Sequence, residues 1–505
     1  MPETGGVVNL ASIIDDHPAS DVAVVSRGRS TSFGELRDQV ARLRGGLSGL
    51  GLVAGDQVAV LCGTNHYFVI SLLAIVGAGM VAVPINPNQP ARETFTRLGQ
   101  VRCRAAVVGP TGARHFAAVD LAALQDLEHV ISPSGTDLAG AIGLEQLLEA
   151  DPVPVVDRLE VDPAVMLFTS GTAGAPRAAV LSHGNLLSNQ RSLEASRSAP
   201  LTAADTALCV LPLFHVFGLN ALLLSGLRAG VSLVLMERFD PVSTIEAIRR
   251  HGVTILSGAP PMWTALGQLP DVTPADVASV RIARSGASAL PPTTFALVRD
   301  RLGLEVAEGY GLTETSPVVC TDGSDGVHPG SIGRPVPGVE VRLVDSDGHD
   351  AVVGDAGEIW VRGPSVFTGY WDDAEATSSV LDDDGWLRTG DVAVADDEGR
   401  LYLVDRLKDV IIVSGFNVFP AEVEEILLEH PAVAMAAVVG HPSPATGETV
   451  IAHVVLAGGA AAEEDDIIDF CCSQMARYKA PTKVVFDDHL PIGATGKVTR
   501  RELRA

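Results

Sequence analysis

Short apolar segments alternate with segments of helical spacing along the first 300 residues. Residues 22–25 and 58–61 are apolar runs of strand length. Between them, residues 32–50 place apolar side chains at helical intervals: Phe33, Leu36, Val40, Leu43 and Leu47. This alternation predicts a parallel α/β fold. We expect a further helix at 243–251 and further strands at 227–236, 254–256 and 280–283.

The longest apolar run covers residues 68–85 and is long enough to match a membrane span. Gly77 and Gly79 interrupt it, however, and Pro84 lies near its end. A helix at 68–76, a turn and a buried strand at 80–85 account for the whole run. We therefore expect no integral membrane span here.

A polar segment at 167–177 follows the apolar run 164–168, which we expect to be a buried strand. The segment combines hydroxyl groups, glycines and a cation, at Thr169, Ser170, Gly171, Thr172, Gly174 and Arg177. Glycines allow backbone N–H groups to approach an anion, and the hydroxyls and the cation add further donors. The spacing differs from the Walker pattern G-x-x-x-x-G-K-[ST]. By itself the segment fits either a phosphate loop or an ordinary polar turn.

A second polar cluster lies at 308–315. Tyr310 offers a flat face, Gly311 permits close approach, and Glu314 is an oxygen ligand suited to Mg²⁺. Farther along, Asp391 could accept hydrogen bonds from both ribose hydroxyls, and Arg406 could donate to the sugar or to phosphate. Taken alone, residues 308–315 fit a strand that ends in a polar turn equally well.

Together, and in this order, these segments resemble the motifs of the adenylate-forming superfamily, which contains the acyl-CoA synthetases. The resemblance runs from Ser32 to Arg501. Two departures occur in the phosphate loop. Ala173 replaces a residue that usually carries a hydroxyl group, and Arg177 with Ala178 replaces the usual Lys-Gly. The positive charge is retained, but the loop has one donor fewer.

The resemblance implies a role for each matching residue. Nucleotide binding falls to Thr169, Ser170, Gly171, Thr172, Gly174, Arg177, Ser288, Glu308, Gly309, Tyr310, Gly311, Asp391 and Arg406. The acyl pocket falls to His215, Phe217, Gly286, Ala287 and Leu312, and the CoA channel to Ser414, Gly415 and Phe416. Catalysis of adenylation falls to Lys497, Thr313 and Glu314, with Glu314 also holding Mg²⁺.

The implied fold is α/β. A large adenylation domain at 1–405, built of α/β layers with a β-rich subdomain, precedes a small mobile α+β domain at 406–505, with a hinge near Lys408. The implied enzyme is an ATP-dependent acid–CoA ligase that forms acyl-AMP and then acyl-CoA, releasing pyrophosphate and AMP. We expect a medium- or long-chain fatty acid as substrate. The chain contains no G-x-S-x-G elbow, which fits a reaction that needs no protein nucleophile.

Two other functions stay open at this point. One is an acyl-AMP ligase that delivers its adenylate to a carrier protein, although no extra segment is evident between residues 336 and 366. The other is an inactive homologue that binds acyl groups or nucleotides, an alternative prompted by the altered phosphate loop.

Composition restricts the partners. The formal net charge is −26 and no basic stripe appears, which argues against nucleic acid. Hydrophobic residues make up 47% of the chain and charged residues 19%, as in a folded enzyme. The six cysteines lack C-x-x-C spacing, so neither a zinc site nor a disulfide framework is expected. No secretory signal is evident, so we expect a cytoplasmic protein; a homodimer and a peripheral membrane association stay open.

Overall fold

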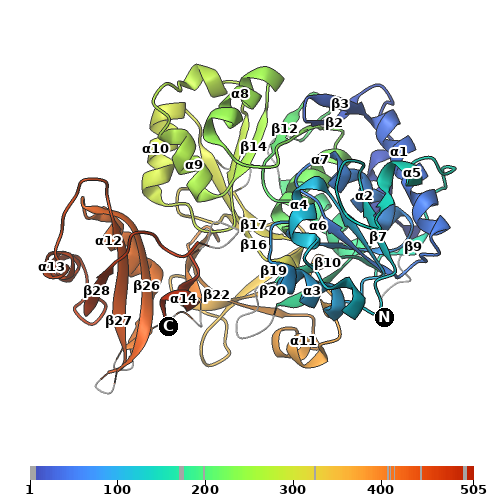
Figure 1. The fold of residues 1–505 in the computed structure, drawn as a ribbon. Helices are drawn as coiled ribbons and strands as arrows, with labels where there is room; N and C mark the ends of the chain where they lie inside the picture. The colour runs from blue at the N-terminus through green and yellow to red at the C-terminus, as the bar shows by residue number, and fades with distance from the viewer. Residues whose placement is uncertain are drawn as a thin grey trace.

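The computed structural model describes residues 7–169, 176–196, 200–322, 326–406, 409, 411–413, 416–443, 446–492 and 498–504, apart from the side chains of residues 7, 405, 406, 416, 417 and 501. Its core consists of two large sheets with a shared layer of helices between them (Figure 1).

The first sheet has eight strands in the order β21-β11-β10-β5-β4-β6-β7-β8. Most neighbours run parallel, but β11 is antiparallel to both β10 and β21. The strands are β4 (Gln57–Leu61), β5 (Val81–Pro84), β6 (Ala105–Val108), β7 (His129–Ser132), β8 (Ile142–Gly143), β10 (Pro163–Thr169), β11 (Arg177–Ser182) and β21 (Gly369–Tyr370). The expected strands at 58–61 and 164–168 are thus confirmed.

The second sheet has nine strands in the order β18-β17-β16-β15-β14-β12-β13-β2-β3. The six strands from β16 to β2 run parallel, and antiparallel strands complete both edges. The strands are β2 (Val22–Ser26), β3 (Arg29–Ser32), β12 (Thr206–Cys209), β13 (Ser232–Leu235), β14 (Ile255–Gly258), β15 (Ile282–Ser285), β16 (Val306–Gly311), β17 (Val318–Thr321) and β18 (Arg334–Pro335).

The expected strand at 227–236 is wrong in its first half. Leu227 lies in helix α7 (Ser225–Arg228), and Gly230 adopts a left-handed conformation, φ 75°, that turns the chain into the strand. Leu227 is fully buried in the helix. An apolar residue fits a buried helix as well as a buried strand, so its side chain does not distinguish the two.

Alternate side chains of a strand point to opposite faces of its sheet, and β4 shows this for the first sheet. Val58 and Val60 face the shared helices, whereas Ala59 and Leu61 face the outer helices of the first sheet. The shared layer contains α1 (Phe33–Gly49), α2 (His66–Gly77), α6 (His183–Ser196), the π-helix η3 (Phe217–Leu224) and α7. The outer helices are α3 (Ala91–Gln100) and α4 (Pro110–Phe116) on one side, and α8 (Pro241–His251), α9 (Pro260–Gly267) and α10 (Pro292–Leu302) on the other.

The apolar run 68–85 divides into α2 and β5, as expected, and both are buried in the large domain. Among the described residues, no helix is both long and apolar enough to cross a bilayer. Short elements complete this part of the chain: β1 (Val7–Val8), η1 (Leu10–Ile14), η2 (Leu121–Ala123), α5 (Leu144–Leu147), β9 (Arg158–Leu159), η4 (Pro274–Val277) and η5 (Thr313–Thr315).

A third, antiparallel sheet closes the large domain and confirms the β-rich subdomain. It contains β19 (Glu340–Val344), β20 (Ala356–Arg362), β22 (Leu387–Ala395) and β23 (Leu401–Arg406), with α11 (Ala374–Val380) beside it. The remaining elements form a small domain with its own hydrophobic core, drawn in orange and red in Figure 1. They are β24 (Ile411–Val413), β25 (Phe416–Val418), α12 (Pro420–Glu429), β26 (Val433–Ser443), β27 (Gly447–Leu456), α13 (Glu464–Gln474), β28 (Lys483–Phe486) and α14 (Arg500–Leu503).

The fold class expected from the sequence is therefore confirmed. The boundary at 405 and the mobility of the small domain stay predictions, and Lys408 lies outside the described residues.

Candidate active site

Two of the predicted segments lie at the ends of strands, and the third lies within a strand of another sheet. Thr169, at the end of β10, pairs with Arg177, at the start of β11, so residues 170–176 connect two antiparallel strands. The second segment runs from β16 into η5, and the third belongs to β22. Four residues of the expected phosphate loop, Ser170, Gly171, Thr172 and Gly174, lie outside the described residues.

Tyr370 connects the predicted metal ligand with the predicted phosphate-binding cation. Its hydroxyl donates to Glu314 Oε1 over 2.8 Å, while the Arg177 guanidinium lies over its ring, 5.5 Å from the centroid. Arg177 Nε is also 3.3 Å from Asp373 Oδ2. The backbone of the same segment helps to place Glu314, because Phe367 N donates to the Glu314 carbonyl over 2.8 Å. The carboxylate therefore lies at the hydroxyl of the Tyr370 ring, and the guanidinium lies over the ring face.

Sequence reasoning missed Tyr370. The signal that could have found it is the Gly369-Tyr370-Trp371 segment, in which an aromatic hydroxyl group directly follows a glycine. Burial first, and then the charge of Glu314, raise the pKa of Tyr370 far above its ordinary value. The phenol therefore stays protonated and acts as a permanent donor to the carboxylate.

A buried hydrogen bond between two side chains joins β16 to β22. Tyr310 donates its hydroxyl to Asp391 Oδ2 over 2.7 Å, and both side chains are buried. Burial, followed by the charge of Asp391, raises the pKa of Tyr310 well above its ordinary value. The sequence predicts that Tyr310 offers a flat face to the nucleotide; the structure adds that its hydroxyl orients the Asp391 carboxylate. Asp391 also pairs with Arg406 across β22 and β23, where the Arg406 side chain is outside the described part.

The backbone around Gly311 leaves no room for a side chain. A Cβ atom on this residue would collide with the carbonyl of Pro317. The same carbonyl accepts a hydrogen bond from Leu312 N over 3.1 Å. The group that approaches Gly311 closely is therefore the backbone of the following turn. Gly309 is also close to backbone, because a Cβ added to it would lie 3.4 Å from the Cys320 carbonyl oxygen.

Glu308, in β16, has a pKa that is raised toward neutrality. Burial raises its pKa to about 7, and neighbouring Asp322 contributes in the same direction. Its Oε2 accepts from Leu290 N over 2.8 Å, which ties β16 to the loop before α10. That loop carries Ala287, in a left-handed conformation with φ 74°, and the exposed Ser288.

The residues expected in the acyl pocket converge in part. A Cβ added to Gly286 would lie 3.0 Å from the ring of Phe217, so these two residues are in contact although 69 positions separate them. His215 packs beside Phe214 with ring centroids 4.8 Å apart, at the entrance to the π-helix. Leu312 packs against the main core.

The sequence places the predicted CoA channel and the predicted catalytic lysine in the small domain. Ser414, Gly415 and Lys497 lie outside the described residues, and for Phe416 only the backbone, in β25, is described. The CoA channel and the catalytic lysine stay predictions.

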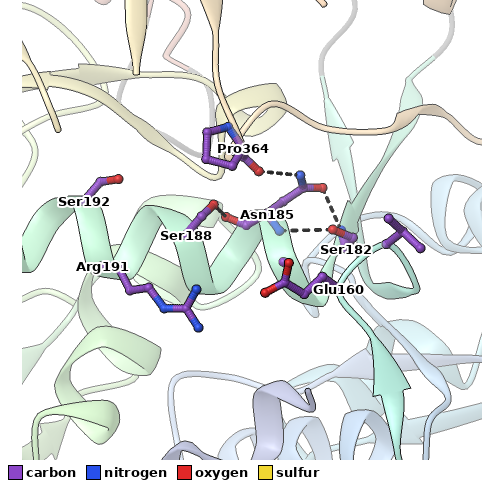
Figure 2. Close-up of a pocket in the computed structure, with 9 residues that line it drawn as sticks. Glu160, Ser182, Asn185, Ser188, Arg191, Ser192 and Pro364 are labelled. Carbon is purple, nitrogen blue, oxygen red and sulfur yellow. Dashed lines mark hydrogen bonds between the residues drawn. The ribbon is translucent and has the colours of Figure 1, made fainter. Parts of the chain in front are cut away.

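A cavity of about 410 Å³ lies at the start of α6 (Figure 2). Its lining includes Glu160, Ser188, Arg191 and Pro364. Figure 2 shows Asn185 pointing across it to the Pro364 carbonyl, to which its amide donates over 2.8 Å. The predicted site residues are not part of this lining. The cavity is therefore separate from the predicted site residues, and Pro364, three positions before Phe367, forms part of its wall.

Comparison with known proteins identifies the class. Residues 12–371 match the AMP-binding enzyme family, and residues 422–497 match the AMP-binding enzyme C-terminal domain. The chain belongs to this family, the adenylate-forming superfamily.

Three relatives illustrate its range. A 3-[(3aS,4S,7aS)-7a-methyl-1,5-dioxo-octahydro-1H-inden-4-yl]propanoyl:CoA ligase of Mycobacterium tuberculosis is 35% identical, over 98% of this chain and 97% of that protein. A long-chain-fatty-acid–CoA ligase of Bacillus subtilis is 33% identical, over 98% and 94%. The ATP-bound crystal structure of MatB from Rhodopseudomonas palustris superposes with a TM-score of 0.91 at 32% identity, covering 98% of each chain.

Proposed function

We propose that this AMP-binding enzyme is an acid–CoA ligase whose substrate is a medium- or long-chain fatty acid. In the first half-reaction, a carboxylate oxygen attacks the α-phosphorus of ATP and pyrophosphate leaves. In the second, the CoA thiol attacks the acyl carbon and AMP leaves. The observation that carries the proposal is the arrangement of Arg177, Tyr370 and Glu314 beside the buried Tyr310–Asp391 pair.

Each described group has a task that its geometry supports. Asp391, oriented by Tyr310, can accept both ribose hydroxyls of the nucleotide. Arg177 supplies a fixed positive charge at the end of the phosphate loop, where Thr169 adds a hydroxyl. Catalysis then rests on positioning and on stabilising the charge that develops at the α-phosphorus.

Magnesium fits the described donors. Mg²⁺ is commonly held by one or two carboxylates together with substrate phosphates and water. Glu314 offers one half-buried carboxylate whose Oε1 is oriented by Tyr370. In the described ranges, no group of three or more His, Cys, Asp or Glu residues forms a complete protein cage. A bound Mg²⁺ would offset the charge of the phosphates, and Glu314 is the residue we assign to hold it.

Lys497 completes the proposed mechanism from the small domain. We assign it to the substrate carboxylate and α-phosphate during adenylation, with the small domain rotating about Lys408 between half-reactions. A lysine that approaches two anions would offset their repulsion in the transition state.

The fatty-acid assignment is supported by the apolar residues at and after Phe217. The Phe217 ring contacts Gly286, and the π-helix that begins at Phe217 contains several buried leucines. The Bacillus subtilis relative is named for long-chain fatty acids. The Mycobacterium tuberculosis relative is named for a fused-ring acid, which the acid panel below therefore includes.

Pyrophosphate release against a panel of carboxylic acids, with and without CoA, tests the proposal. We expect acid-dependent release, thioester formation with CoA, and the highest kcat/KM for medium- or long-chain fatty acids. Glu314→Gln should lose most of this activity, while Glu375→Gln, at an exposed position on α11, serves as the matched control. Adenylate without thioester would favour an acyl-AMP ligase, and absence of release with every acid would overturn the enzyme assignment.

A further inference from the structure

Helix α6 presents a fully buried amide to the turn that follows Glu314. Asn189 is completely inaccessible to solvent. Its Nδ2 donates to the Val318 carbonyl over 2.8 Å and to the Thr315 carbonyl over 3.3 Å, while its Oδ1 accepts from Val318 N over 3.3 Å. The Asn189 side chain therefore pairs with both the N–H and the carbonyl of Val318, as the backbone of a neighbouring strand would.

A second buried amide reaches the same turn from the π-helix. Asn220 Nδ2 donates to the Ser316 carbonyl over 2.6 Å and to the Leu186 carbonyl of α6 over 3.1 Å. Its Oδ1 accepts from Gln190 Nε2 over 2.8 Å. The π-helix η3 and α6 are thus joined to the backbone between Glu314 and β17. π-Helical turns are rare and occur often at functional sites.

A third amide holds the segment on the other side of Glu314. Asn185 Nδ2 donates to the carbonyls of Pro364 and Val366, each over 2.8 Å, as Figure 2 shows for Pro364. The next residue, Phe367, is the one whose N–H donates to the Glu314 carbonyl. Tyr370, three positions farther, donates to the Glu314 carboxylate.

Burying an amide is costly unless its donors and acceptors are satisfied, and losing one partner leaves the other desolvated. Here three buried amides on α6 and η3 donate hydrogen bonds to two segments that both contact Glu314. Resting on the proposed function, we propose that Asn185, Asn189 and Asn220 are positioning residues for adenylation. They hold the Glu314 carboxylate in place before magnesium–ATP arrives, so its orientation does not have to form during binding.

The test compares Asn189→Ala with Asn9→Ala in the full-length protein. Asn9 is a matched control because it is also buried and donates to two backbone carbonyls, those of Val76 and Val156, over 3.1 and 2.9 Å. It ties the N-terminal segment to the large domain. The readouts are the unfolding midpoint, and the Kd of ATP measured by calorimetry with Mg²⁺ and with EDTA.

We expect both variants to lower the unfolding midpoint. Only Asn189→Ala should weaken the affinity for ATP in the presence of Mg²⁺, by about tenfold, with the affinity in EDTA within about twofold of the parent; changes to groups that orient a metal ligand typically cost about 10–100-fold. Acid-dependent pyrophosphate exchange should fall by a similar factor, while thioester formation from supplied acyl-AMP stays within about twofold.

Equal loss of ATP affinity with and without Mg²⁺ would overturn the proposal, as would the same Mg²⁺-specific loss in Asn9→Ala. If Asn189→Ala does not fold, Asn185→Ala at the edge of the cavity carries the same expectation. A parent protein that forms no acyl-AMP with any acid refutes the proposed function instead, and the ATP titrations still decide the positioning role.

Discussion

Glu308→Gln tests whether a carboxyl group buried beside the site lowers stability at neutral pH. Glu308 is 6% exposed, and its oxygen accepts from Leu290 N. Burial raises its pKa from the ordinary 4.5 to about 7. Glutamine is neutral at every pH and keeps one oxygen that can accept from Leu290 N.

The magnitude follows from linkage. Because the folded pKa lies above the unfolded one, the folded protein retains a proton between pH 4.5 and about 7 that the unfolded chain releases. Stability is therefore greater below this window and falls as the pH rises through it. A difference of this size corresponds to ~3 kcal/mol, the cost of the buried carboxylate above pH 7.

Urea denaturation of parent and variant at pH steps from about 4.5 to 8 measures this cost. We expect the free energy of unfolding of Glu308→Gln, relative to the parent, to rise with pH by up to ~3 kcal/mol. Glu308 also accepts from Gly330 N, and glutamine, with a single oxygen, loses one of these two backbone hydrogen bonds, which lowers the stability of the variant. A difference that stays constant across the range would refute the reasoning, because Glu308 would then titrate as an ordinary exposed carboxyl.

Three further substitutions test individual contacts of the site. Tyr370→Phe removes the donor to Glu314, so the Mg²⁺ concentration for half-maximal pyrophosphate exchange should rise by about tenfold; an unchanged Mg²⁺ dependence would argue against the contact. Gly286→Val should push against Phe217 and raise the KM for bulky or long acids while sparing that for ATP, and steady-state kinetics showing the reverse would move the acyl pocket elsewhere. Arg177→Lys keeps the charge, so turnover should stay within about tenfold, equivalent to ~1.4 kcal/mol, with the main change in the KM for ATP; a loss of several orders of magnitude would mean that the loop depends on the guanidinium itself.

Local patterns were sufficient for most elements of the large domain. Helix α1 was predictable because five apolar residues share one face, and Ser32 with Glu35 closes its first turn. The strand expected at 227–236 failed because Leu227 is equally suited to a buried helix and a buried strand. Sheet order was not predictable, since parallel strands pair through contacts between residues far apart in sequence, such as Val165 with Ala82.

Candidate site residues can be predicted where chemistry depends on residue type within a short motif. Glu314 and Asp391 are predicted in this way, and the structure shows that each accepts a hydrogen bond from a tyrosine hydroxyl. The hydroxyl contacts of Tyr310 and Tyr370 were missed because a tyrosine motif does not reveal whether the ring or the hydroxyl is used. Asn189 leaves no sequence pattern, because its partners are backbone groups of Thr315 and Val318, 126 and 129 positions away.

The central claim is that the carboxylate attacks the α-phosphorus of ATP, and isotope transfer tests it most directly. The enzyme would be supplied with a fatty acid carrying ¹⁸O in both carboxylate oxygens, ATP, Mg²⁺ and CoA, and the products analysed by mass spectrometry. The account predicts that each AMP released gains one ¹⁸O atom and that pyrophosphate gains none. Label in phosphate or pyrophosphate, or unlabelled AMP formed together with thioester, would contradict it.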